Sequence, residues 1–146
     1  MSGSDLTQNA REIITSYSRG DWNNLKNLLT PDAVYNEIGT QRRIQGPDQI
    51  VRTLQDWKKA MTDSSGSVTH SLASGNRVVL ELTWQGTHNG PFSGPAGTLS
   101  PTGRRQTTPA VMIVTFQGDK VKEVNHYFDM LSFLQQIGAM PSTTRA

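Results

Sequence analysis

Val121-Lys-Glu-Val-Asn-His-Tyr-Phe-Asp129 is the stretch that decides the fold, and it leads directly into Met130-Leu-Ser-Phe-Leu-Gln-Gln-Ile-Gly138. The alternation of residue character over 121–128 predicts a β-strand. One face of this strand would carry Lys122, Val124, His126 and Phe128, and the other Val121, Glu123, Asn125 and Tyr127. An imidazole on a largely apolar face is either a core histidine with satisfied hydrogen bonds or a pocket residue. The strand alone favours the core histidine, because buried polar groups usually find a partner.

Length and composition bound the kind of protein. The chain has 146 residues, enough for a single domain, 1–146, with a real hydrophobic core; residues 1–5 and 140–146 are expected to be loosely ordered tails. It contains no cysteine, which excludes a disulfide framework, a cysteine zinc site and a thiol nucleophile. The N-terminus has no signal-peptide pattern and no apolar run approaches a membrane span, so we expect a cytoplasmic protein with no membrane partner.

The charge pattern argues against nucleic acid as a partner. The net charge is +2, and the basic residues come in scattered pairs at Arg42-Arg43, Lys58-Lys59 and Arg104-Arg105. No aromatic residues interleave with these pairs, as a surface that binds single strands would require. We therefore expect no nucleic-acid binding.

The first part of the chain predicts three helices around a short strand. The first helix runs from about Leu6 to Ser18, with apolar residues at helical spacing: Ala10, Ile13, Ile14 and Tyr17. Asp21 caps a second helix, which carries Trp22, Leu25, Leu28 and Leu29. The third opens at Gly46-Pro47-Asp48 and buries Ile50, Leu54, Trp57 and Met61. In the strand over 33–38, alternation places Ala33, Tyr35 and Glu37 on one face.

The second part predicts strands over 68–73, 77–88, 107–116 and 121–128, the last three as an antiparallel meander. The strand over 77–88 would turn Val78, Leu80, Leu82, Trp84, Gly86 and His88 to one face, and the next strand would turn Ala110, Met112, Val114 and Phe116 inward. Helices followed by a curved antiparallel sheet indicate an α+β fold, in which helices cover one face of the sheet. The interior of such a cone is a natural pocket for a small molecule.

Several motifs in this order resemble the SnoaL-like polyketide cyclases, a branch of the nuclear transport factor 2-like superfamily that also holds ketosteroid isomerase. The similar segments are Arg19-Gly-Asp21, Pro31-Asp32, Trp84-Gln-Gly-Thr-His88-Asn-Gly90, Pro101-Thr-Gly-Arg104 and Val121…Asp129…Leu134-Gln-Gln136-Ile-Gly138. The resemblance covers nearly the whole chain. It implies a cone-shaped NTF2-like fold, with N-terminal helices packed on a strongly curved mixed or antiparallel sheet.

The functional positions of these families carry over unevenly. In the polyketide cyclases, the catalytic aspartate of the ring-closing aldol reaction falls on His126 and a second pocket histidine falls on Met112, whereas the histidine of the Gly-x-His element matches His88. In the ketosteroid isomerases, the carboxylate base falls on Glu37. Their oxyanion hole is made of a Tyr and a protonated Asp, and this Asp is a known example of a carboxylic acid kept neutral by its surroundings. These two positions fall on Ile13 and Met112. Steroid isomerisation therefore lacks its electrophile.

Together, the residues and the resemblance give a candidate site. Its catalytic residues would be His126, Glu37 and His88, and its substrate-binding wall Tyr35, Trp84, Met112, Val124 and Phe128. A Glu and His set can supply a base and a donor for proton abstraction next to a carbonyl. We expect cyclase-like acid–base chemistry on a small hydrophobic carbonyl compound, with no metal and no cofactor. The alternative is a non-catalytic binding or carrier module.

Simpler roles stay open for several of these residues. Glu37 could be a solvated surface acid beside Arg42 or Arg43. His88 could simply close a strand before the loop over 89–105. Asp129 is better placed to cap the last helix by bonding the backbone near Ser132 than to act in a pocket.

The outer face of the sheet predicts a homodimer. If the inner face serves the core and the pocket, the residues facing away are Val79, Glu81, Thr83, Val111, Ile113, Thr115, Val121 and Tyr127. In a two-fold contact, a second copy of the chain would cover this mixed apolar and polar patch with the same patch of its own. The family that the chain resembles usually forms dimers in this way.

Overall fold

The computed structural model describes residues 3–94 and 97–139. Its helices are α1 (Gly3–Arg19), α2 (Trp22–Asn27), the short 3-10 helix η1 (Ile38–Thr40), α3 (Pro47–Ala60) and α4 (Met130–Gln136). Its strands are β1 (Leu29–Glu37), β2 (Arg42–Gln45), β3 (Ser65–Ser74), β4 (Arg77–Thr87), β5 (Phe92–Gly94), β6 (Gly97–Leu99), β7 (Arg105–Gln117) and β8 (Lys120–Phe128).

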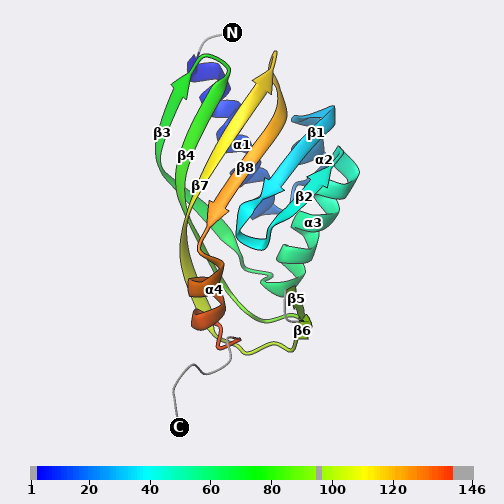
Figure 1. The fold of residues 1–146 in the computed structure, drawn as a ribbon, viewed down its shortest axis with the longest axis vertical. Helices are drawn as coiled ribbons and strands as arrows, with labels where there is room; N and C mark the ends of the chain where they lie inside the picture. The colour runs from blue at the N-terminus through cyan, green and yellow to red at the C-terminus, as the bar shows by residue number, and fades with distance from the viewer. Residues whose placement is uncertain (1–2, 95–96, 140–146) are drawn as a thin grey trace.

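Six strands form one sheet in the order β2-β1-β8-β7-β4-β3. All neighbours in it are antiparallel except β1 and β8, which run parallel. In Figure 1, α1 lies behind this sheet, α3 lies along its β1–β2 side, and α4 with the small β5–β6 hairpin sits at the end where β4 and β7 extend beyond the other strands. The expected α+β class with a curved mixed sheet is therefore confirmed.

The helices form for the reasons that their sequences give. The predicted apolar stripe of α1 is buried, with Ile13 and Ile14 at 3% and 2% exposure. At the start of α2, the Asp21 side chain accepts a hydrogen bond from the Asn24 backbone at 3.2 Å, which confirms the expected N-cap. Before α3, Gly46 takes a φ of 89°, a conformation that glycine adopts without strain, and Pro47 follows in the first turn.

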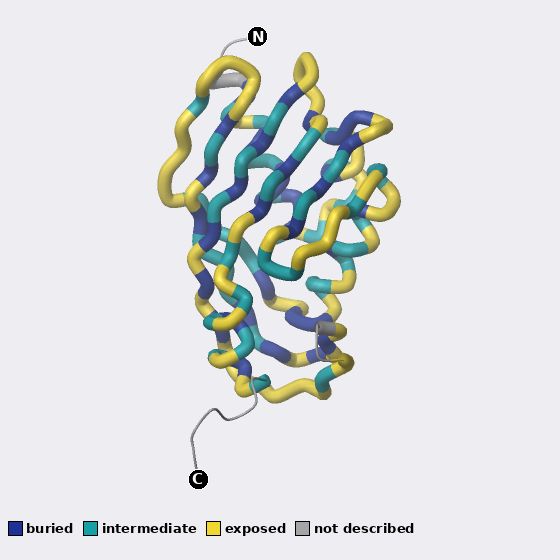
Figure 2. Tube along the Cα trace, viewed as in Figure 1, coloured by how far each residue is buried: buried dark blue, intermediate teal, exposed yellow. Residues whose placement is uncertain are grey.

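β4 and β7 bury the faces that the sequence predicts. Figure 2 shows the resulting alternation of buried and less buried residues along the sheet. The face assignment at the start of β8 is wrong. A register shift opposite Thr115 and Phe116 inserts one extra residue into β8. Val121 consequently turns into the core with no exposed surface, and Lys122 faces solvent. From Val124 onward the predicted faces hold, and His126 is buried.

Some elements differ from the sequence expectations. Leu29, expected on the second helix, begins β1, whose partner β2 and the β5–β6 hairpin were not anticipated by the alternation pattern. Residues 3–5, expected in a loose tail, form the first turn of α1, and residues 1–2 and 140–146 lie outside the described residues. Within the described ranges, every helix is too short or too polar to span a membrane.

The outer sheet face leads to a first prediction, a homodimer. Tyr127 is 43% exposed there, and Val111 and Ile113 are only partly covered. We propose that a second copy covers this face, so light scattering at micromolar concentration should give twice the chain mass. Ile113→Lys should yield a folded monomer, because it places a charge in the contact. A wild-type protein of single-chain mass would contradict the proposal.

Candidate functional site

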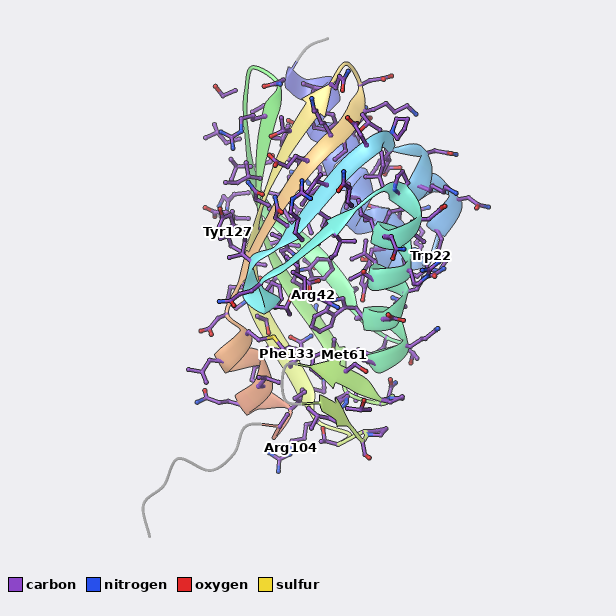
Figure 3. All side chains as sticks on the ribbon, turned by 45° about the vertical axis from the view of Figure 1, so that its right-hand side comes forward. Trp22, Arg42, Met61, Arg104, Tyr127 and Phe133 are labelled. Carbon is purple, nitrogen blue, oxygen red and sulfur yellow. The ribbon has the colours of Figure 1, made fainter. Side chains whose placement is uncertain are left out.

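An aromatic cavity lies between the concave face of the sheet and the helices. Its wall is formed by Tyr17, Tyr35, Glu37, Leu54, Trp57, Met61, Ser64, Trp84, Gln106, Thr108, His126, Phe128 and Phe133. The space inside measures about 60 Å³, which is above the size that a cavity needs to hold water. Figure 3 shows how Met61, at the end of α3, and Phe133, on α4, come together at one end of the molecule, where they belong to one apolar cluster.

Glu37 brings a carboxylate to this cavity at 1% exposure. The β1–η1–β2 turn sets Arg42 directly opposite it, and Oε1 accepts from Arg42 Nε at 2.9 Å and Nη2 at 2.6 Å. Thr40 Oγ1 donates to the same oxygen, whereas Oε2 accepts from Trp57 Nε1 at 2.8 Å. A buried charge needs such partners to offset its desolvation. The pairing with Arg42 expected as one alternative is thus present, but its acid is buried instead of solvated.

His126 lies beside Glu37 in the parallel β1–β8 pairing. Its Nδ1 is 2.8 Å from the Tyr35 hydroxyl, and its Nε2 accepts from Trp84 Nε1 at 2.9 Å. Burial lowers the pKa of His126 to about 3, so the imidazole is neutral near pH 7. His126 is therefore both a satisfied buried histidine and a wall of the cavity.

The two tyrosines of the wall keep their protons. Burial raises the pKa of Tyr35 well above its usual value, and the negative charge of Glu37 acts in the same direction. Burial also raises the pKa of Tyr17 to about 12, and the Tyr17 hydroxyl is 2.7 Å from Ser64 Oγ. At neutral pH both groups are available as hydroxyl donors.

A further polar pair of the wall, Gln106 and Thr108, lies on β7. Gln106 Oε1 accepts from Thr108 Oγ1 at 2.6 Å, and Thr108 Oγ1 accepts in turn from Gln136 Nε2 of α4 at 3.4 Å. This chain ties α4 to the sheet beside the cavity. Asp129 supports the same helix, because its side chain accepts from the Ser132 backbone at 3.0 Å, as the N-cap prediction requires.

The structure brings together five of the eight predicted site residues: Tyr35, Glu37, Trp84, His126 and Phe128. Met112 and Val124 do not line the cavity. Both are 1% exposed and pack in the main core, where α1 covers the sheet. The catalytic and binding roles proposed for the five residues that line the cavity stay predictions.

His88 also lies outside the cavity wall. Its Nδ1 accepts from the Thr102 backbone at 3.3 Å and lies 3.0 Å from Thr102 Oγ1, and its backbone N–H donates to Arg104 O at 2.8 Å. These bonds hold the two ends of the loop between β4 and β7 together. Burial lowers the pKa of His88, in keeping with this structural position.

The sequence reasoning missed several wall residues. Trp57, Leu54 and Met61 were assigned to a buried helix stripe, and Tyr17 to the stripe of α1, but periodicity does not distinguish a side chain that packs from one that borders a cavity. The residue type was the signal available in the sequence, because Tyr and Trp combine an apolar ring with a polar O–H or N–H that suits the border of a cavity. In residues 3–94 and 97–139, no group of three or more potential ligand side chains is placed to hold a metal ion.

The arrangement joins a carboxylate and protonated hydroxyls on one largely apolar wall. A carboxylate can accept a proton from carbon next to a carbonyl, and a hydroxyl can donate to the oxygen on which charge develops. Water exclusion strengthens both interactions. The chemistry that this geometry supports is therefore enolisation of a carbonyl compound.

Comparisons with known proteins agree with this architecture. The family model for SnoaL-like polyketide cyclase matches residues 7–137. No curated protein matches the chain significantly in sequence.

Solved structures share the fold at low sequence identity. AclR from Streptomyces galilaeus, a proposed hydroxylase, superposes with a TM-score of 0.81 at 24% identity, covering 99% of this chain and 91% of its own. A proposed SnoaL-like polyketide cyclase from Jannaschia sp. CCS1 gives 0.84 at 18% identity, covering 95% of each chain. A protein of ketosteroid isomerase-like fold from Catenulispora acidiphila DSM 44928, solved with trimethylamine, gives 0.77 at 17% identity, covering 90% of this chain and 93% of its own. The expected fold family is confirmed.

Removal of Arg42 tests the buried ion pair. Loss of one partner of a buried pair costs about 3–5 kcal/mol, and because the Arg42 side chain is 45% exposed, we expect Arg42→Ala to lower the free energy of unfolding by an amount near or below the lower end of that range. Urea denaturation measures this loss. The control is Arg43→Ala, which removes an exposed neighbouring side chain that donates a hydrogen bond to Gln45. Equal losses in the two variants would contradict the pairing role.

His126 predicts a specific dependence of stability on pH. Its folded-state pKa of about 3 lies below the usual 6.5, so between these values the unfolded chain binds a proton that the folded chain does not. The free energy of unfolding should therefore fall as the pH drops below 6.5, by up to about 1.4 kcal/mol per pH unit.

The test compares urea denaturation from pH 7 to 5 in the wild type and in His126→Gln. The variant should lose most of this slope, whereas His70→Gln, at an exposed histidine of β3, should keep it. An unchanged slope in His126→Gln would show that His126 is not buried in its neutral form.

Proposed function

The chain belongs to the SnoaL-like polyketide cyclase family, and we propose that it is a cofactor-independent enzyme that closes a ring in a small hydrophobic carbonyl compound by an intramolecular aldol reaction. One observation carries the proposal. A buried carboxylate, Glu37, and a protonated hydroxyl, Tyr35, border the same aromatic cavity from one strand. These are the base and the donor that enolisation needs.

Glu37 Oε2 is assigned as the base. Oε1 accepts hydrogen bonds from both Arg42 and Thr40, whereas among the described residues Oε2 accepts from Trp57 alone and keeps a lone pair for a substrate proton. In the reaction, Oε2 takes a proton from the carbon next to one carbonyl, whose oxygen receives a hydrogen bond from Tyr35. The resulting enolate carbon forms a bond with the second carbonyl carbon, and the oxygen of that carbonyl takes up the proton.

His126 is assigned a supporting role in this reaction. The position was expected to act as the acid or base, but both of its ring nitrogens are engaged, by Tyr35 and by Trp84. An imidazole with a pKa of about 3 is also a weak base near neutrality. We therefore place His126 behind Tyr35, and His88, which holds the loop, outside the chemistry.

The hydroxyl pair of Tyr17 and Ser64 is suited to bind the second carbonyl of the substrate. Tyr17 and Ser64 share one hydrogen bond, so one of their two O–H groups remains to donate to a ligand. Their place on the cavity wall supports a substrate with more than one carbonyl group.

A non-catalytic binding module is the second candidate, and one observation favours it. The donors on Glu37 satisfy the carboxylate without any ligand, as in a structural ion pair. Because a proposed hydroxylase shares this fold, the fold by itself does not decide the chemistry. Turnover of a carbonyl probe separates the two candidates.

Heptane-2,6-dione is a suitable probe, since its intramolecular aldol reaction gives 3-methylcyclohex-2-enone and water, followed by ultraviolet absorbance. Tyr35→Phe and Glu37→Gln should each lower the rate of ring closure by roughly a hundredfold or more. Tyr127→Phe is the matched control, because it removes a tyrosine hydroxyl on the exposed outer face and should keep the wild-type rate. Binding of the dione with no closure above the uncatalysed rate would instead support the binding module.

A further inference from the structure

We infer that Trp84 is a positioning residue that fixes the proton of His126 on Nδ1 and thereby makes the Tyr35 hydroxyl a donor to the ligand. The inference rests on the proposed function only in taking the ligand atom at Tyr35 to be a carbonyl oxygen. Its first part, the location of a proton in the unliganded protein, is independent of any activity.

The first step concerns the bond between Trp84 and His126. An indole N–H is a donor only, and it lies 2.9 Å from His126 Nε2. Nε2 must therefore present its lone pair, which excludes both the imidazolium form and the tautomer with a hydrogen on Nε2. A neutral imidazole carries one N–H, so the hydrogen lies on Nδ1.

The second step concerns Tyr35. Its oxygen is 2.8 Å from Nδ1, so it accepts the Nδ1–H hydrogen bond and does not donate to that nitrogen. Across the described residues, Tyr35 Oη has no other hydrogen-bond partner. The hydroxyl hydrogen is then free for the cavity that Tyr35 lines, where it selects an acceptor such as a carbonyl or enolate oxygen.

The three groups form one directed chain from Trp84 through His126 to Tyr35. Each bond in such a chain polarises the next, and the low dielectric of a buried site strengthens the effect. The donor strength of Tyr35 toward a ligand should thus depend on an indole that does not contact Tyr35 through any hydrogen bond. This dependence distinguishes Trp84 from a residue that merely fills the wall.

The fold holds the Trp84 ring in the orientation that this chain needs. Gly66 is its cross-strand partner on β3, and a Cβ at that position would lie 2.8 Å from the ring. On another side, the Tyr17 ring meets it edge-on with centroids 5.3 Å apart. The absence of a side chain at Gly66 therefore leaves the space that the indole occupies.

Nitrogen-15 NMR of the unliganded protein at pH 7 tests the location of the proton. The chain has three histidines, and the signals lost in His126→Gln identify the ring of His126. We expect a protonated, pyrrole-type shift for Nδ1 and an unprotonated, pyridine-type shift for Nε2. In Trp84→Phe, the indole N–H that excludes a hydrogen from Nε2 is gone. The tautomer with the hydrogen on Nε2 then becomes populated, so the Nε2 shift should move toward the protonated value.

The matched control is Trp57→Phe, which removes the indole that donates to Glu37 and should leave the His126 tautomer unchanged. A protonated Nε2 in the wild-type protein would overturn the inference. That result needs only the wild-type spectrum and its assignment with His126→Gln, so it decides the matter even if Trp84→Phe does not fold.

Infrared spectroscopy of bound carbonyl-labelled cyclohexanone tests the second part. The carbonyl stretch should shift to lower frequency in the wild type, lose this shift in Tyr35→Phe, and lose a large part of it in Trp84→Phe. The same band position in wild type and Trp84→Phe would overturn the role of Trp84. If these results hold but heptane-2,6-dione is not cyclised, the proposed function fails while the positioning role of Trp84 stands.

Discussion

The negative charge of Glu37, held at 1% exposure, is the constraint on which the rest of the site depends. Such a charge is tolerated only with close partners, and they come from separate elements: Arg42 from β2, Thr40 from η1 and Trp57 from α3. The carboxylate thereby ties the β1–β2 turn and the third helix to one point. It also acts on the cavity itself, because its charge helps to raise the pKa of the neighbouring Tyr35.

Much of the fold could be predicted from residue periodicity. The stripes of α1 and α3 and the alternation along β4 and β7 follow from burying one face of each element, and this requirement leaves a direct trace in the sequence. The misassigned elements lack such a trace. A single extra residue in β8 reverses the faces of Val121 and Lys122, and β2 is a four-residue edge strand with three exposed positions. Both are set by backbone pairing with a neighbouring strand, β7 for β8 and β1 for β2, and the alternation of side chains along one strand carries no record of that pairing.

The candidate site could be predicted in part for the same reason. Tyr35 and Glu37 share a face, as do His126 and Phe128, so alternation was enough to direct them inward. Hydrogen bonding could not be read in this way. Nothing in the periodicity of β4 indicates that the Trp84 indole donates to His126, or that His88, directly after the end of β4, holds a loop instead. The family resemblance pointed to the position of His126, but not to the neighbours that determine its protonation.

The parallel pairing of β1 with β8 has a consequence for how the molecule folds. Tyr35 and His126 are 91 residues apart in the chain, and their bond exists only when the last strand has inserted between β1 and β7. Contacts of such long sequence separation carry a high loop-closure entropy and limit the folding rate. A nascent chain that has not yet released residues 120–128 lacks β8 and with it His126 and Phe128, so it has no assembled site. The cavity is therefore incomplete until β8 has joined the sheet and α4 has brought Phe133 to its wall.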